Sequence, residues 1–326
     1  EKSSKKYMER RIMRTFKTMI MASLFSLSAI VAFNASAQSA DNARFLSLAP
    51  AGGLPVIPVF EGWTANADGS TSYSFGFINR NSEGAIDLPL GALNFIEPAK
   101  YSGFQPTHFP SGRSTGAFTV TIPAEEKGTD VWWNLKPADG GDVLKVPGRA
   151  TSGAYELDFI RPRPQGALQP LAGFGTNGEL KPGLQAQIGE HNGAVKAGEP
   201  VVLIINATDP SDRDSSDPRF TNPLPMGVTF SMYQGPGNVT FARHESTKIP
   251  TNPYKETNRR FRFWTAPAEN AMTIDDTSGV ARVIATFSEP GEYMIRTMVD
   301  NFRAPDSQQG DQCCWTNIIQ KVTVTP

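Results

Sequence analysis

Short segments that alternate apolar with small or polar residues, each closed by a turn-forming cluster, constrain this chain most. Residues 72–78 (SYSFGFI), 117–122 (AFTVTI) and 280–287 (VARVIATF) have the period of two that buries one face of a β-strand. Gly and Pro supply 29 and 26 of the 326 residues, and they gather between these segments. No sustained 3.6-residue period interrupts residues 55–160. The pattern predicts an all-β protein.

The first 37 residues have the three parts of a cleavable secretory signal peptide. Basic residues precede an apolar stretch over 19–33, and Ala35-Ser36-Ala37 offers a small-x-small cleavage site. The apolar stretch is shorter than the roughly 20 residues that a spanning helix needs. Residues 1–7 precede the first Met and are expected to be untranslated. The mature protein is therefore expected to be exported, to a periplasm or to the extracellular space.

Removing this leader changes the charge of the protein. The chain has 31 Lys and Arg and 32 Asp and Glu, of which residues 1–37 hold seven and two, so 24 basic and 30 acidic residues remain, a net charge of −6. An acidic protein is poorly suited to nucleic acid, so no nucleic-acid partner is expected. No later run of 18 apolar residues occurs, so no transmembrane segment is expected in the mature chain.

Proline spacing divides the mature chain into two predicted domains. Four prolines fall within 161–182, which is interpreted as a Pro/Gly-rich linker. Residues 38–54 are small and polar and are predicted to form a flexible arm. Residues 55–160 are predicted to form a first β-sandwich. Residues 183–326 contain about seven short strand patterns, which favours an immunoglobulin-like second sandwich.

The second half also resembles a known family. Residues 227–241 (GVTFSMYQGPGNVTF) and 287–293 (FSEPGEY), followed by Val299 and Asp300, are similar to bacterial PKD-like (polycystic kidney disease) domains. Phe230 stands where that family usually has Trp. The resemblance implies an Ig-like fold and a spacer or adhesive role. Residues 60–63 (FEGW) and 105–109 (QPTHF) resemble a family of exported bacterial proteins, and this implies no activity.

Residues 259–264 (RRFRFW) interleave cations with aromatic rings. On a strand, Arg260, Arg262 and Trp264 share one face, which predicts a platform for an anionic polymer or a sugar. The alternative is a solvated face that protects a sheet edge. Trp133 and His108 are further ligand-binding candidates. Trp132 and Trp133 place one indole on each side of a strand, and the alternatives for Trp133 and His108 are a core ring and a hydrogen-bonded loop histidine.

Four carboxylates within nine residues form the candidate metal site. They are Asp209, Asp212, Asp214 and Asp217, and hard oxygen ligands of this kind suit Ca²⁺. The alternative is a solvated acidic loop with Asx-turns. The only cysteines are Cys313 and Cys314, which leaves a vicinal disulfide, two thiols or bonds to another chain.

No catalytic constellation is recognisable, so the sequence leans against an enzyme. It favours an exported binding or surface-presentation protein whose partner is a glycan or an envelope protein. One alternative is a polysaccharide-acting enzyme with two carboxylates between the domains. The other is a structural spacer in an envelope assembly.

Overall fold

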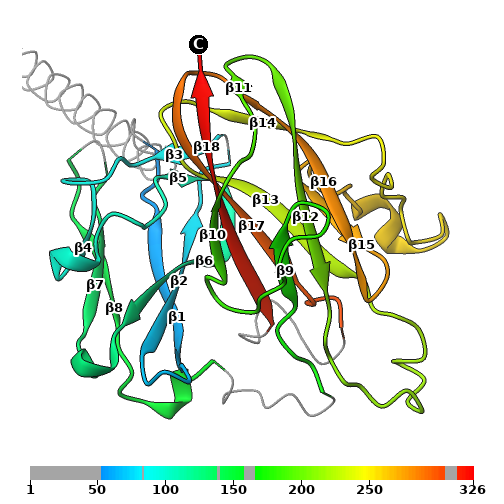
Figure 1. The fold of residues 1–326 in the computed structure, drawn as a ribbon, viewed down its shortest axis with the longest axis horizontal. Helices are drawn as coiled ribbons and strands as arrows, with labels where there is room; N and C mark the ends of the chain where they lie inside the picture. Colours follow the sequence, from blue (N-terminus) through cyan, green and yellow to red (C-terminus); the bar gives the residue numbers. More distant parts are fainter. Residues whose placement is uncertain (1–52, 83, 138–139, 158–165, 305–313) are drawn as a thin grey trace, which may run out of the picture. The chain divides into compact units, whose positions relative to one another are not determined.

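A computed structural model describes residues 53–82, 84–137, 140–157, 166–304 and 314–326. The predicted leader, and the predicted arm up to residue 52, lie outside this part of the chain. The described residues form eighteen strands and four short 3-10 helices (Figure 1), so the all-β prediction is confirmed. Residues Leu54–Pro326 make one compact unit. No helix among the described residues is long and apolar enough to cross a membrane.

Two three-stranded antiparallel sheets and a short strand pair build the first half. One sheet has the order β1-β2-β6, the other has the order β4-β7-β8, and β3 pairs with β5. Their bounds are β1 Ile57–Ala65, β2 Thr71–Asn79, β3 Ile86–Asp87, β4 Asn94–Glu97, β5 His108–Phe109, β6 Gly112–Ile122, β7 Val131–Leu135 and β8 Leu144–Gly148. Alternation on β2 and β6 buries Phe75 and Phe118 against Trp133 of β7, so the two sheets share one aromatic core.

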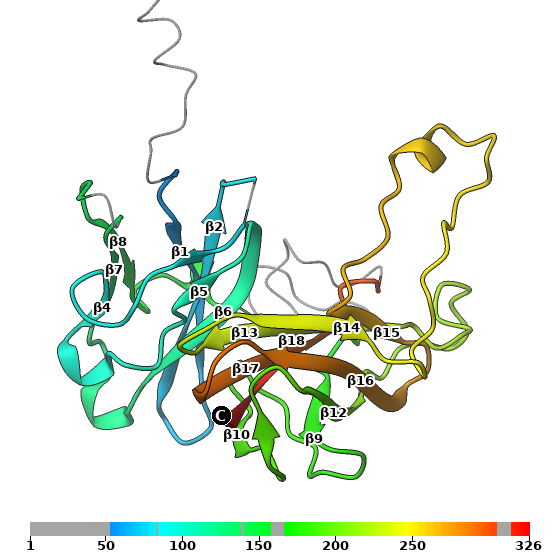
Figure 2. The same cartoon turned by 90° about the horizontal axis from the view of Figure 1, so that it is seen from above.

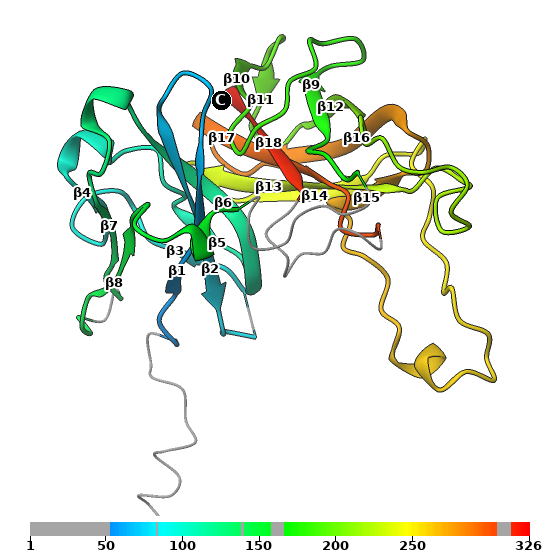
Figure 3. The same cartoon turned by 90° about the horizontal axis from the view of Figure 1, so that it is seen from below.

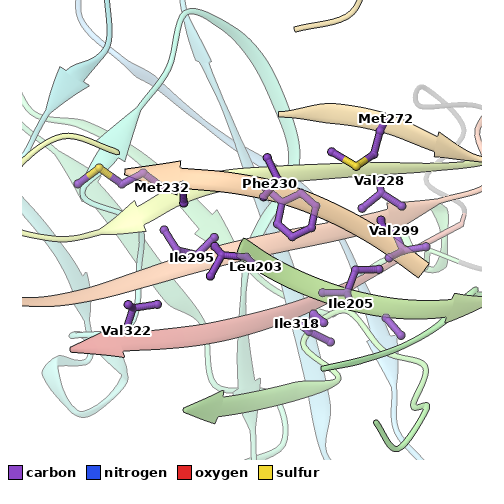
Figure 4. Packing of buried hydrophobic residues seen from close by; sticks show 14 of the residues in the cluster. Leu203, Ile205, Val228, Phe230, Met232, Met272, Ile295, Val299, Ile318 and Val322 are labelled. Atoms are coloured by element: carbon purple, nitrogen blue, oxygen red, sulfur yellow. The ribbon is translucent and has the colours of Figure 1, made fainter. Parts of the chain in front are cut away.

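The second half is a two-sheet sandwich. One sheet has the order β10-β18-β17-β13-β15, with β11 also paired to β18, and the other has the order β14-β16-β12-β9. Their bounds are β9 Leu171–Phe174, β10 Gln187–Glu190, β11 Val195–Lys196, β12 Pro200–Thr208, β13 Met226–Gln234, β14 Val239–Arg243, β15 Ala271–Ile274, β16 Ser278–Phe287, β17 Gly291–Asp300 and β18 Trp315–Thr325. Figure 4 shows inward side chains of both sheets filling the space between them, among them Leu203, Phe230 and Ile295.

The first sandwich packs on the outer face of the six-stranded sheet. Tyr233 and Ile319 belong to that sheet, yet both are buried in the aromatic core of the first half. The amide of Thr107 donates to the carbonyl of Tyr233 at 2.9 Å, and the Asn317 side chain donates to the carbonyl of Gly116 at 2.9 Å. The two cores are therefore joined by both apolar and polar contacts.

The two segments that resemble PKD-like domains meet at the turn between β13 and β14. Residues 235–238 connect β13 to β14, and Tyr293 packs edge-on against Phe287 at 4.8 Å between ring centroids. The Tyr293 hydroxyl donates to the carbonyl of Glu289 at 2.9 Å and accepts from the amide of Gly237 at 3.2 Å. Membership of that family stays a prediction.

Two local expectations differ from the structure. Arg259–Phe263 is the 3-10 helix η4 and not a strand, because Asn258 accepts the amide of Arg260 at 2.9 Å and no neighbouring strand pairs with this segment among the described residues. It lies on the excursion 244–270 between β14 and β15 (Figure 2, Figure 3). Within the stretch 161–182 interpreted as a linker, residues 161–165 are outside the described part, and Leu171–Phe174 is strand β9, paired with β12.

Candidate functional site

A cleft of about 720 Å³ lies where β2 and β6 approach the loop before β10 and the start of β18. We call it the hydroxyl cleft because hydroxyl and amide side chains dominate its lining. These side chains are Thr64, Asn66, Ser70, Ser72, Thr119, Thr121, Gln169 and Gln185. Its apolar lining includes Leu157, Leu184 and Trp315.

Strand alternation places the hydroxyls there. On β2, Tyr73 and Phe75 point into the aromatic core, so Ser72 points to the opposite face. Ser72 is paired with Thr121 of β6, and their hydroxyl oxygens lie 3.0 Å apart. The amide of Asn66 donates to Ser72 at 2.9 Å. The result is a preorganised ladder of small polar groups on a rigid sheet.

Two buried polar atoms in the lining residues lack partners among the described residues. They are the indole Nε1 of Trp315 and the hydroxyl of Thr119, whose side chains are 1% and 8% exposed. A buried polar atom without a partner is destabilising, and it is normally satisfied by water or by a ligand. The Trp315 Nε1 lies against Gly116 of β6, so the unused hydrogen-bonding capacity of the lining is that of the Thr119 hydroxyl.

The charge of the cleft is low. Among the described lining residues Asp68 is the one carboxylate, and no Lys or Arg lines the cleft. Asp68 accepts hydrogen bonds from the amide and hydroxyl of Ser70 at 3.0 and 2.6 Å, which lowers the pKa of Asp68. A glycosidase needs two carboxyl groups about 5–10 Å apart. The lining residues do not supply the second.

The cation–aromatic segment does not form the predicted face. Arg260 lies 5.9 Å above the ring of Tyr254, and Arg262 is exposed. Trp264 is half-buried and lines a separate cavity of about 470 Å³, together with Lys248 and Arg303. The structure does not place these three predicted residues along one strand, because the segment is η4.

Trp133 and His108 have different surroundings. Trp133 is fully buried, and its Nε1 donates to Asn94 at 3.0 Å, so it is a core ring. Its neighbour Trp132 is half-buried, with the Lys145 ammonium 5.1 Å from its ring centre. His108 is half-buried and lines a cavity that also contains Arg113.

Three of the four predicted calcium ligands are separately engaged. Asp209 pairs with Arg213 at 2.9 Å. Asp214 accepts from Ser216, and this hydrogen bond lowers the pKa of Asp214. Asp217 pairs with Arg219, which lowers the pKa of Asp217 to about 2. The described residues contain no group of three or more His, Cys, Asp or Glu arranged to hold a metal. Calcium binding by Asp209, Asp212, Asp214 and Asp217 stays a prediction.

Cys314 is 1% exposed and engaged in a disulfide. Cys313 lies outside the described residues, so the vicinal disulfide also stays a prediction. Sequence reasoning missed the hydroxyl cleft. The signal was present, because Ser and Thr alternate with aromatic or aliphatic residues in both 72–75 and 118–122.

Comparisons with known proteins give weak structural likenesses. No family model matches the chain, and no curated protein matches it. The D0-D1 domain of intimin is 13% identical, covers 83% of this chain and 100% of its own, and has a TM-score of 0.20. CfaE, the adhesive subunit of a fimbria of enterotoxigenic Escherichia coli, is 13% identical, covers 83% and 88%, and has a TM-score of 0.22. The S. aureus collagen adhesin is 10% identical, covers 83% and 93%, and has a TM-score of 0.19. Such scores transfer no ligand or site to this chain.

Proposed function

We propose that this chain is an exported, non-enzymatic binding protein that holds a neutral saccharide in the hydroxyl cleft. The unused hydrogen-bonding capacity of Thr119, beside a ladder of hydroxyls and amides, is the observation that carries the proposal. Sugar hydroxyls both donate and accept, so they complement such groups. A neutral ligand suits the cleft because its described lining residues include one carboxylate and no cation.

The alternatives have less support. Since Asp68 has no second carboxylate beside it in the described lining, we propose binding without turnover. The three-part leader supports export, and the glycan is proposed to belong to an envelope or to a surface outside the cell. A pure spacer needs no such cleft.

The test is retention of the full chain on a panel of insoluble neutral polysaccharides, with release of soluble sugar assayed in parallel. Thr119→Val is the diagnostic variant. The Thr119 hydroxyl has no partner among the described residues, so the isosteric change removes no hydrogen bond that they make. It is expected to weaken retention about fivefold, the effect of roughly 1 kcal/mol for one lost hydrogen bond.

Thr323→Val is the matched control, because Thr323 is an exposed residue of β18 outside the cleft. It is expected to leave retention unchanged. Retention by the wild type that Thr119→Val weakens supports the proposal. Equal retention by all three proteins, or retention by none, contradicts the proposed site, and release of soluble sugar contradicts the non-enzymatic role.

A further inference from the structure

A second cavity, of about 220 Å³, lies between β6 and the outer face of the six-stranded sheet. It shares no lining residue with the hydroxyl cleft. We call it the arginine cavity, because Arg113 and Arg296 line it and none of its described lining residues is an Asp or Glu. His108, Ser111, Ser114 and Thr115 add polar groups to its lining.

Arg296 is the central observation. Its side chain lies on the face of β17 opposite Ile295 and is buried, with the residue 6% exposed. Its guanidinium donates to the carbonyl of Gly116 at 2.6 Å and to the hydroxyl of Ser114 at 3.3 Å. All its described hydrogen-bond acceptors are neutral, and no described carboxylate lies within 4.0 Å of it. Burial lowers the pKa of Arg296 to about 10, which leaves it charged at neutral pH.

A buried charge is normally paired, because removing it from water is costly. Glu61 is a described carboxylate whose charge acts on Arg296, but Gly116 bridges the two side chains: its N–H donates to Glu61 at 2.6 Å and its carbonyl accepts from Arg296. Burial also raises the pKa of Glu61 to about 7, so its carboxyl is only partly ionised at neutral pH. The described part of the chain thus leaves the Arg296 charge largely uncompensated.

The other polar groups of the cavity complete a receptor for an anion. Arg113 is half-exposed, with its Nη2 3.9 Å from Glu61, and it adds a second cation. His108 is held in place by a 2.8 Å contact with Asp87. The Thr115 hydroxyl is buried and has no partner among the described residues.

We propose that the arginine cavity binds the carboxylate of a small organic acid, with Arg296 as the central ligand and Arg113 at the entrance. The planar guanidinium fork matches the two oxygens of a carboxylate. Phe77, Ala117 and Met298 give the cavity apolar walls, which suit an organic acid better than a fully hydrated inorganic phosphate. The free acid and the acid group of a sugar share this chemistry, and the test separates them.

The test is isothermal titration of the full chain, at low ionic strength, with propionate, glucuronate and inorganic phosphate. Saturable millimolar binding of a carboxylate that exceeds phosphate binding is expected. Tighter propionate binding assigns the site to free small acids, whereas tighter glucuronate binding assigns it to acidic sugars. No saturable binding, or phosphate binding as tight as carboxylate binding, overturns the proposal.

Substitutions test whether the carboxylate binds in the arginine cavity. Arg296→Met is expected to weaken it more than about tenfold, since hydrogen bonds to a charged group contribute about 1.5–3 kcal/mol. Arg296→Met also loses hydrogen bonds to β6 and can fail to fold for that reason. Thr115→Val and Arg113→Gln then test the same site. Thr115→Val is isosteric and Arg113 is half-exposed, and each is expected to weaken binding about two- to fivefold. Arg259→Gln, on η4, is the control. Unchanged affinity in both Thr115→Val and Arg113→Gln overturns the assignment.

Discussion

Glu61 gives the protein a pH-dependent stability that one substitution removes. Glu61 lies on β1, and its buried carboxyl accepts hydrogen bonds from the amide of Gly116 at 2.6 Å and the hydroxyl of Ser74 at 3.3 Å. Burial raises the pKa of Glu61 from 4.5 to about 7, against the smaller opposing effects of these hydrogen bonds and of the Arg113 charge. The folded protein therefore keeps this proton to a higher pH than the unfolded chain does.

The size of the effect follows from linkage. At 1.36 kcal/mol per unit of pKa, the difference between 4.5 and about 7 corresponds to about 3 kcal/mol. The stabilisation is fully present below pH 4.5 and is lost as the pH rises through 7. Between pH 5 and 8 the wild type is expected to lose about 2.5 kcal/mol of unfolding free energy on this account.

Glu61→Gln is expected to remove this loss, because a neutral amide keeps an acceptor for Gly116 and has no proton to release. The assay is urea unfolding at intervals from pH 5 to 8, followed by tryptophan fluorescence without reductant. Asp300, whose pKa burial also raises, contributes equally to both proteins and cancels in the comparison. Glu125→Gln, at an exposed carboxylate, keeps the wild-type slope. Parallel pH dependences for Glu61→Gln and the wild type would refute the reasoning.

Three other substitutions test the packing. Gly116→Ala is expected to lower the unfolding free energy by about 3 kcal/mol, because its φ is +55° and a Cβ would lie 2.2 Å from Nε1 of Trp315. Gly112→Ala, at φ +95° with open space around it, is expected to cost about 1 kcal/mol, so equal losses in urea unfolding contradict the clash. Trp133→Ala is expected to cost about 3–5 kcal/mol by thermal unfolding, and a loss below about 1 kcal/mol contradicts its place in the core. Tyr293→Phe removes a hydroxyl that bridges two turn backbone groups, and is expected to lower the unfolding free energy measured with urea by about 1 kcal/mol, whereas no change argues against that bridge.

The strands were the part of this structure that sequence could predict. The alternation in 72–78, 117–122 and 280–287 falls within β2, β6 and β16 because the period of two is a local property of the chain. The apolar run at 200–207 lies in β12, which pairs with β16 on one side and β9 on the other. The same period failed at 259–264, because alternation without a pairing partner does not make a strand.

Local sequence patterns could not predict the two cavities. The hydroxyl cleft joins Ser72 to Trp315, and the arginine cavity joins Arg113 to Arg296. These contacts depend on how the first sandwich lies on the outer face of the second, which no window of sequence encodes. In the sequence, Arg296 is an ordinary polar residue of an alternating strand. Its burial follows only from the contact with β6 in the folded protein.

Tyr233 and Ile319 determine whether the two halves of the chain can be separated, in evolution or by force and proteolysis. They belong to the second sandwich but fill the core of the first, so each half without the other exposes apolar surface that both now bury. The two halves are therefore not independent modules that domain shuffling can separate and recombine. A pulling force or a protease that opens one half also destabilises the other. Residues 54–326 are therefore expected to fold and unfold as one cooperative unit.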